Sequence, residues 1–308
     1  MPADASYHHL DMPATVLNGP TGTQLIRRGV DCSGPAWSAR AVVHAPHVLE
    51  QIHREYAEAG ADIHVACTFR TQPSLFPATH QELTARAVDL ARRAAQPGAR
   101  VAGSIAPIGD CYQPDQSPLH RGEAGILEAE RLHAAMAESL IAAGVDLLLC
   151  ETFALADEGL LAARVALRAA SSARVPVWLS LSPGPEATLV TPGQVTVAAR
   201  QAIDSGVAAV LVNCVAAYHT LKYVDALARA AAGSAVPFGA YANAGDARAE
   251  LGWNPDGNAR THAESYADFA QRWADAGATI IGSCCGTGPA HTRELVARFS
   301  RAGLSRAE

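Results

Sequence analysis

Residues 143–153 read AGVDLLLCETF. A glycine-containing join leads into an apolar run that is too short for a helix and typical of a buried parallel strand. We expect the strand at residues 147–150. Amphipathic stretches rich in Ala, Leu, Glu and Arg lie on both sides, so the segment has the pattern of one strand–helix unit.

The same join recurs along the chain, as AGAD at 59–62, SGVA at 205–208 and AGAT at 276–279. Glycine at this point fits a left-handed helix C-cap. The recurrence indicates a βαβα unit used four times, with each candidate strand followed by a candidate helix. The eight expected strands are residues 14–17, 63–67, 101–105, 147–150, 177–181, 209–213, 238–241 and 279–282.

Eight consecutive parallel strand–helix units favour an α/β fold of one domain, a closed (β/α)8 or TIM barrel. The 308 residues, 49% of them hydrophobic, suffice for such a barrel. An open doubly wound sheet is the alternative, but the turn NGPTGT at 18–23 lacks the spacing of a dinucleotide-binding loop. Long connections follow the first, third and seventh strands, on the face where barrel enzymes keep their chemistry.

The ends of the chain and its charge set further expectations. We expect a flexible N-terminus at 1–12, the barrel domain at 13–303 and a short tail at 304–308. With 24 basic against 30 acidic residues and no basic stripe, we expect no nucleic-acid partner. No apolar run approaches a membrane span and no signal sequence is visible, so we expect a cytoplasmic protein without a membrane partner. The sequence sets no oligomeric state.

Seven cysteines are an odd count without a secretion signal, which favours metal binding or catalysis over a disulfide framework. Cys214 follows the sixth expected strand, and Cys284 and Cys285 follow the eighth. In a barrel these positions meet at the mouth, where three thiolates leave one tetrahedral position of a zinc ion open. Buried structural cysteines or a vicinal disulfide between Cys284 and Cys285 are the alternatives.

The ligand type constrains the reaction. Three thiolates make zinc a poor activator of water, whereas a thiol bound in the open position is deprotonated and stays nucleophilic. The chemistry that this site predicts is therefore alkylation of a thiol.

These motifs resemble the homocysteine S-methyltransferase family, above all its single-domain members that use S-methylmethionine or S-adenosylmethionine. The resemblance extends from residue 16 to residue 295, and its most specific parts are Asn213-Cys214 and the segment 280–286, IIGSCCG. It implies that Cys214, Cys284 and Cys285 hold Zn²⁺ and that homocysteine adds its sulfur as the fourth ligand. The bound thiolate, rather than a protein nucleophile, then takes the methyl group and gives methionine.

The resemblance also implies that Glu151 binds the amino group of homocysteine. Asn18 stands where the family has Asp, and Ser283 where it has Gly. Cys67 also departs from the family, which puts the substrates rather than the metal in question. The other expected substrate-binding residues are Asn18, Gly19, Thr23, Ser104 and Asn243.

A donor that carries a sulfonium or quaternary ammonium group suits a cage of aromatic faces. Candidates for the donor pocket are Tyr241, Trp37, Phe69 and Phe153, with Tyr112 and Trp253 also in mouth-side loops. Tyr241 and Asn243 are also candidates for the open metal position. Packing is the alternative for each. The alternative functions are another thiol or selenol acceptor, a betaine-like donor, or a non-catalytic zinc or redox-sensing barrel.

Overall fold

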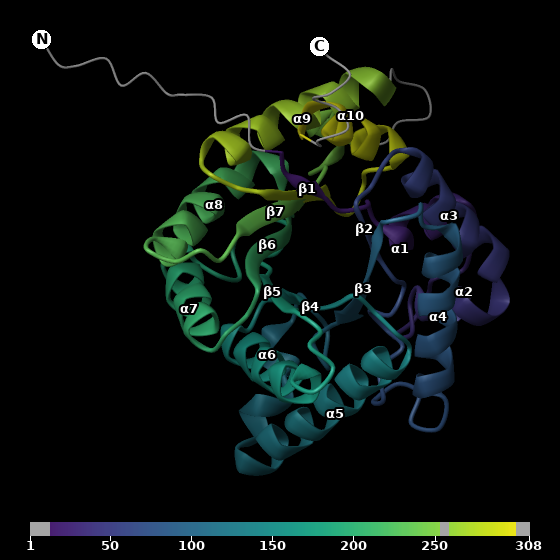
Figure 1. The fold of residues 1–308 in the computed structure, drawn as a ribbon, viewed down its shortest axis with the longest axis vertical. Coiled ribbons are helices and arrows are strands. Elements are labelled where there is room, and N and C mark those ends of the chain that lie inside the picture. The colour runs from purple at the N-terminus through teal and green to yellow at the C-terminus, as the bar shows by residue number, and fades with distance from the viewer. Residues whose placement is uncertain (1–12, 253–258, 300–308) are drawn as a thin grey trace, which may run out of the picture.

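The computed structural model describes residues 13–252 and 259–299, in which eight parallel strands form one ring (Figure 1). The expected flexible N-terminus at 1–12 and the tail at 304–308 lie outside the described residues. The strand order is β1-β8-β7-β6-β5-β4-β3-β2, which is the order of a barrel in which each strand pairs with the next. The strands are β1 Thr15–Val16, β2 Ile63–Val65, β3 Arg100–Ile105, β4 Leu147–Phe153, β5 Val177–Leu181, β6 Ala209–Ala216, β7 Phe238–Asn243 and β8 Ile280–Ser283.

Helices surround the strands on the outside of the ring (Figure 1). No helix within the described ranges is both long and apolar enough to cross a membrane. The α-helices are α1 Thr21–Arg27, α2 Ala39–His44, α3 Pro46–Glu58, α4 His80–Ala94, α5 Glu123–Ala142, α6 Ala156–Ala170, α7 Pro192–Asp204, α8 Ala217–Ala231, α9 Ala259–Asp275 and α10 Pro289–Phe299, with short 3₁₀ turns at Pro114–Gln116, Pro118–Arg121 and Ala247–Ala249.

The ring closes between β1 and β2, its shortest strands. Leu17 and Ile63 form a parallel bridge, and the amide of Asn18 donates to the carbonyl of Ile63 at 2.9 Å. The first and last segments of the described chain also meet, because the amide of Ala14 donates to the carbonyl of Phe299 at 2.8 Å. The closed (β/α)8 barrel is therefore confirmed.

The glycines of the repeated joins adopt the left-handed conformation that a C-cap needs, with φ of +93° at Gly60, +77° at Gly144, and +97° at both Gly206 and Gly277. A residue with a Cβ is strained there. The predicted strands match the observed ones closely except at β4 and β6, which continue by three residues through a shift of register. Both extensions bear on the site.

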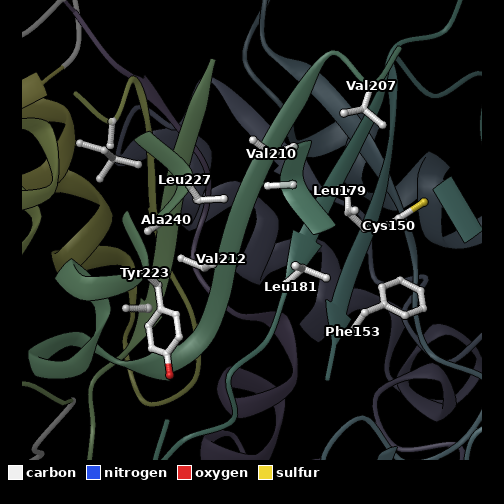
Figure 2. Close-up of a cluster of buried hydrophobic side chains, with 14 of the residues drawn as sticks. Cys150, Phe153, Leu179, Leu181, Val207, Val210, Val212, Tyr223, Leu227 and Ala240 are labelled. Atoms are coloured by element: carbon white, nitrogen blue, oxygen red, sulfur yellow. The ribbon is translucent and has the colours of Figure 1, made fainter. Parts of the chain in front are cut away.

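Two apolar layers hold the barrel together. Inside the ring, side chains such as Leu149 and Leu211 fill the centre. Outside it, Val210 and Val212 alternate with them and pack against the helices, as Figure 2 shows beside Tyr223 of α8. This alternation sets which side chains reach the mouth, since the next inward positions on β4 and β6 are polar.

Candidate metal centre and substrate pocket

Three thiols converge at the carboxyl ends of the strands. Cys214 lies near the end of β6, and Cys284 and Cys285 follow β8, with β7 between the two strands. The sulfurs lie within 4.8 Å of one another, and those of Cys214 and Cys284 are 2.6 Å apart. The structure therefore brings together the three cysteines that the sequence predicted as metal ligands.

A local change of backbone turns Cys214 toward the mouth. Leu211 and Asn213 face the interior of the ring, so regular alternation would point Cys214 outward to the helices. Instead Cys214 has φ of +51°, and the register between β6 and β7 shifts from Asn213 to Ala216. A non-glycine residue in this region carries strain that only its surroundings can maintain.

Asn213 supplies part of those surroundings. Its Oδ1 accepts hydrogen bonds from the amide of Thr152 at 3.1 Å and from the hydroxyl of Ser180 at 2.7 Å. Its Nδ2 donates to the Thr152 hydroxyl at 2.7 Å. Thr152 is itself left-handed, with φ of +65°, in the register shift of β4. Asn213 thus ties the two irregular strand ends together directly before Cys214.

The loop of Cys284 and Cys285 is anchored from both sides. The amide of Cys284 donates to Ala242 of β7 at 2.7 Å, and the Thr287 hydroxyl lies 2.7 Å from the carbonyl of Cys284. The Thr287 hydroxyl also lies 2.9 Å from that of Ser283, so the serine that replaces the usual glycine is held within the loop. Gly286, with φ of +82°, completes the turn.

The donor set fits a thiophilic metal ion. Hydrogen bonds from Cys214 and Cys284 hold the pKa of Cys285 well below that of a free thiol, whereas the pKa of Cys284 is raised well above it by Cys214, Cys285 and burial. Ionisation of all three neighbouring thiols therefore needs a nearby cation. In a tetrahedral zinc site with bonds of about 2.3 Å the sulfurs lie about 3.8 Å apart, within the span observed here.

Glu151 is the buried acid of the site. It follows Leu147 and Leu149 in the inward series of β4 and is 8% exposed. Its carboxylate accepts hydrogen bonds from the Ser104 hydroxyl at 2.5 Å and the Tyr241 hydroxyl at 2.7 Å. Burial raises the pKa of Glu151, and the two hydroxyls oppose the rise. The arrangement leaves an anionic acceptor suited to an ammonium group.

A pocket of about 740 Å³ opens above these groups. This is within the usual size of small-molecule sites, roughly 300–1,000 Å³. Trp37 and Phe69 contribute an aromatic wall, with ring centroids 6.0 Å apart in an edge-to-face arrangement. Gly22 must lack a side chain, because a Cβ there would overlap the Trp37 ring. The pocket thus joins the thiols and Glu151 to an aromatic surface.

Two of the predicted substrate-binding residues line the pocket near β1. The Oδ1 of Asn18 accepts from the amide of Val65 at 3.0 Å, while its buried Nδ2 has no partner among the described residues. A Cβ at Gly19 would meet the Tyr56 hydroxyl at 2.7 Å. The first loop therefore lies against α3 and exposes its backbone to the pocket.

Among the described residues, Phe153, Thr23 and Asn243 were predicted for the site but do not line the pocket. The prediction that Phe153 faces the donor pocket is wrong: it is fully buried between barrel and helices (Figure 2). Its ring centroid lies 5.9 Å from that of His133. Alternation from Glu151 would point it inward, but the register shift after Cys150 turns it outward. Thr23 and Asn243 are not among the described residues that line the pocket, and Trp253 lies outside the described residues.

The structure places three further residues at the site: Asn213 and Arg70, which had no predicted role, and Tyr112, which was expected only as a mouth-side aromatic. A polar residue at an inward position of an apolar strand is a usable signal in the sequence for Asn213. The pKa of Cys214 is raised well above its ordinary value: a hydrogen bond with Cys284 lowers it, Cys285 and burial raise it by more, and Tyr112 adds a smaller lowering hydrogen bond. Arg70 lines the pocket from the loop after β2. Loop residues such as Tyr112 and Arg70 follow no periodicity, so only the fold reveals them.

Comparison with known proteins agrees with this geometry. The family model described as homocysteine S-methyltransferase matches residues 15–299. The chain is 30% identical to the homocysteine S-methyltransferase of Escherichia coli, over 92% of this chain and 94% of that protein, and 25% identical to the selenocysteine methyltransferase of Astragalus bisulcatus, over 94% and 93%.

Solved structures give the same result. The metallated form of the homocysteine methyltransferase MmuM from Escherichia coli superposes with a TM-score of 0.72 at 27% identity, covering 94% of this chain and 97% of that one. The oxidized form of the same protein gives a TM-score of 0.71 at 26% identity. The match over nearly the whole chain shows that this protein belongs to the homocysteine S-methyltransferase family.

Proposed function

We propose that this protein transfers a methyl group from a small onium donor, S-methylmethionine or S-adenosylmethionine, to the thiol of homocysteine and so forms methionine. The observation that carries the proposal is the cluster of three thiols within 4.8 Å at the mouth of the barrel, beside a buried carboxylate. Family membership and the name of the Escherichia coli relative support homocysteine as the acceptor.

We further propose that Cys214, Cys284 and Cys285 hold zinc. When bound, zinc would supply a Lewis acid that favours the thiolate form of the homocysteine sulfur at neutral pH. Glu151 would bind the ammonium group of homocysteine and orient its sulfur, with Ser104 and Tyr241 fixing the carboxylate. Trp37 would face the positive donor, whose charge an aromatic face attracts.

The reaction balances without an acid or base from the protein at the reacting carbon. The homocysteine thiol loses its proton to solvent water, and its sulfur forms the new bond to the methyl carbon. The bond from that carbon to the donor sulfur breaks, and its electron pair neutralises the sulfonium. With S-methylmethionine as the donor, both products are methionine. The pocket's main task is to align the two sulfurs in line with the methyl group.

The test is to supply the zinc-loaded protein with homocysteine and a methyl-labelled donor, either S-methylmethionine, S-adenosylmethionine or betaine, and to measure labelled methionine by mass spectrometry. Elemental analysis of the same samples gives the zinc content. We expect one zinc per chain and transfer from a sulfonium donor. Cys284→Ser should lose both, whereas Cys32→Ser, a cysteine that does not line the pocket, should keep both.

Two results would overturn the proposal. Full activity in the Cys284→Ser variant, or in protein freed of metal, would rule out the metal centre. Absence of labelled methionine with every donor would rule out the reaction. Selenocysteine and other thiols, run as competing acceptors, reveal whether homocysteine is preferred.

A further inference from the structure

We propose that Arg70 is the carboxylate-binding residue of the pocket and that it anchors the carboxylate of an amino-acid substrate. The inference rests on the proposed function, which makes both the acceptor and the sulfonium donor amino acids. It adds a specificity-determining residue to a site in which the cysteines and Glu151 account only for a thiol and an ammonium group.

The charges around the pocket carry the first step. Apart from the thiols, the lining in the described part of the chain holds three acidic or basic side chains: Glu151, Asp110 and Arg70. Glu151 is buried at the end of β4, Asp110 is exposed in the loop after β3, and Arg70 is half-buried in the loop after β2. A free amino acid at neutral pH carries one charge of each sign, so Arg70 is the complement that this lining offers to a carboxylate.

The guanidinium of Arg70 is already held in place. Its Nη1 donates to the carbonyl of Gly109 at 2.9 Å and, more weakly, to that of Pro107 at 3.3 Å. Its central carbon also lies 5.0 Å from the centroid of the Phe69 ring, a cation–π contact. A long side chain fixed in this way loses little conformational freedom when a ligand arrives, which favours binding.

These contacts use one of its three nitrogens. No described residue accepts from Nε or Nη2 of Arg70 or forms an ion pair with it. Other half-buried arginines differ, since Arg28 pairs with Glu55 at 2.6 Å and Arg298 with Asp268 at 2.7 Å. The free edge of a guanidinium presents two parallel N–H groups at the spacing of the two oxygens of a carboxylate. Arg70 is thus held in place through Nη1, while its Nε and Nη2 have no acceptor among the described residues.

The test compares substrates with analogues that lack only the carboxylate. For homocysteine the analogue is 3-aminopropane-1-thiol, and for S-methylmethionine it is (3-aminopropyl)dimethylsulfonium. Dissociation constants are measured by calorimetry on zinc-loaded wild type, Arg70→Met and Arg70→Lys. Arg272→Met is the matched control, because Arg272 also lies over an aromatic ring, 5.1 Å from the centroid of Phe269, but on the outer helix α9.

We expect Arg70→Met to weaken one of the two amino acids about 10- to 100-fold, the usual effect of losing a charge-assisted pair, and to leave its decarboxylated analogue within about twofold. Arg70→Lys should recover part of the loss, since it keeps the charge without the fork. The substrate that responds, acceptor or donor, identifies the carboxylate that Arg70 binds. Steady-state kinetics should show the same change in KM with little change in kcat.

Equal weakening of an amino acid and its analogue would overturn the inference, because Arg70 would then only hold the loop of Pro107 and Gly109. Unchanged affinity for both amino acids would overturn it as well. Because the readout is binding, the result does not depend on turnover. Binding that responds to Arg70 without methyl transfer would refute the proposed reaction alone, whereas transfer with no response at Arg70 would refute this inference alone.

Discussion

Without a bound substrate, burial makes the ionised form of the Glu151 side chain energetically unfavourable. Burial raises its pKa from the ordinary value of 4.5, and the hydroxyls of Ser104 and Tyr241 only partly oppose the rise. Because the folded pKa lies above the unfolded one, the contribution of Glu151 to stability is fully present below about pH 4.5 and is lost as pH rises through the folded pKa. An arriving ammonium group would reverse this cost.

Replacing Glu151 with Gln should therefore separate stability from activity. We expect Glu151→Gln to have a higher free energy of unfolding than wild type at pH 8, with the difference shrinking toward pH 5, as urea titrations would measure. The same change should raise the KM for homocysteine about 10- to 100-fold, because a charge-assisted hydrogen bond is lost. Glu186→Gln, in an exposed loop, is the control. If the stability of Glu151→Gln relative to wild type were lower at pH 8 than at pH 5, the predicted direction of the pH dependence would be wrong.

The positions of the cysteines after the sixth and eighth strands were enough to predict them as site residues, whereas Glu151 was predicted from the resemblance to the family. The orientation of Cys214 and the error at Phe153 share one cause that the sequence did not reveal. Both residues lie in register shifts, where the alternation of inward and outward side chains breaks and a non-glycine residue takes positive φ, Cys214 itself in one case and Thr152 in the other. The residue types at these positions do not predict a left-handed backbone conformation.

At the scale of elements, the loop between β3 and α5 is fastened to the helical layer by a buried acid. Glu158 of α6 is 2% exposed, accepts from the amide of Ile108 at 2.9 Å and lies 3.3 Å from Nε2 of His133 on α5. Burial raises the pKa of Glu158, but bonds from His133 and Ile108 more than offset this and lower it. The fastened loop carries Cys111 and Tyr112 to the pocket.

We expect Glu158→Ala to destabilise the protein by about 3 kcal/mol, because the amide of Ile108 loses its buried acceptor and His133 its partner. Hydrogen exchange of the amides at 106–122 should accelerate, and KM for the donor should rise while the zinc content stays at wild type. The control is Glu128→Ala, which removes an exposed ion pair with Arg121 and should cost less than about 1 kcal/mol. Unchanged exchange in the loop would show that Glu158 does not fasten it.

A contact between two buried histidines, on α3 and β2, predicts that the protein loses stability in acid. His53 of α3 and His64 of β2 are both fully buried, their ring centroids are 6.1 Å apart, and their ring nitrogens have no hydrogen-bond partners among the described residues. Burial lowers the pKa of His53 to about 3 and that of His64 to about 4. Since both folded values lie below 6.5, stability present above that pH is lost as pH falls and the unfolded chain takes up protons.

Each such histidine contributes a slope of up to about 1.4 kcal/mol per pH unit. We therefore expect His53→Met to lose stability less steeply than wild type between pH 6 and pH 5, by about 1 kcal/mol per unit, in urea unfolding followed by circular dichroism. His120→Met, at an exposed position, should keep the wild-type slope. Equal slopes for wild type and His53→Met would mean that the folded protein protonates this pair.

The elements themselves were largely predictable. The eight strands fell where short apolar runs predicted them, and the glycine joins predicted the left-handed C-caps that Gly60 and Gly277 adopt. Periodicity is strong there because one face of each element is buried. The loops that complete the pocket, with Trp37, Arg70 and Tyr112, have no such pattern, since their positions depend on contacts between distant segments.

In the whole molecule, the residues of the candidate site lie at one end of the barrel axis, and contacts that stabilise the fold lie at the other. The thiols and Glu151 lie at the carboxyl ends of the strands, with the loops after β1, β2 and β3 around them. The opposite end carries the glycine joins and the bond between Ala14 and Phe299. Changes at that end should therefore alter folding without reaching the pocket.

The bond between Ala14 and Phe299 has a consequence for chain order. A circular permutant that joins 299 to 14 through a short flexible linker and opens between Gly233 and Ser234, exposed in the loop before β7, should fold and keep the KM values of the parent, as kinetics and thermal melting would measure. The same linker with an opening between Asp110 and Cys111 should lower activity, because it cuts the wall of the pocket. If the first permutant folds and keeps its activity, the barrel forms whichever strand the ribosome synthesises first.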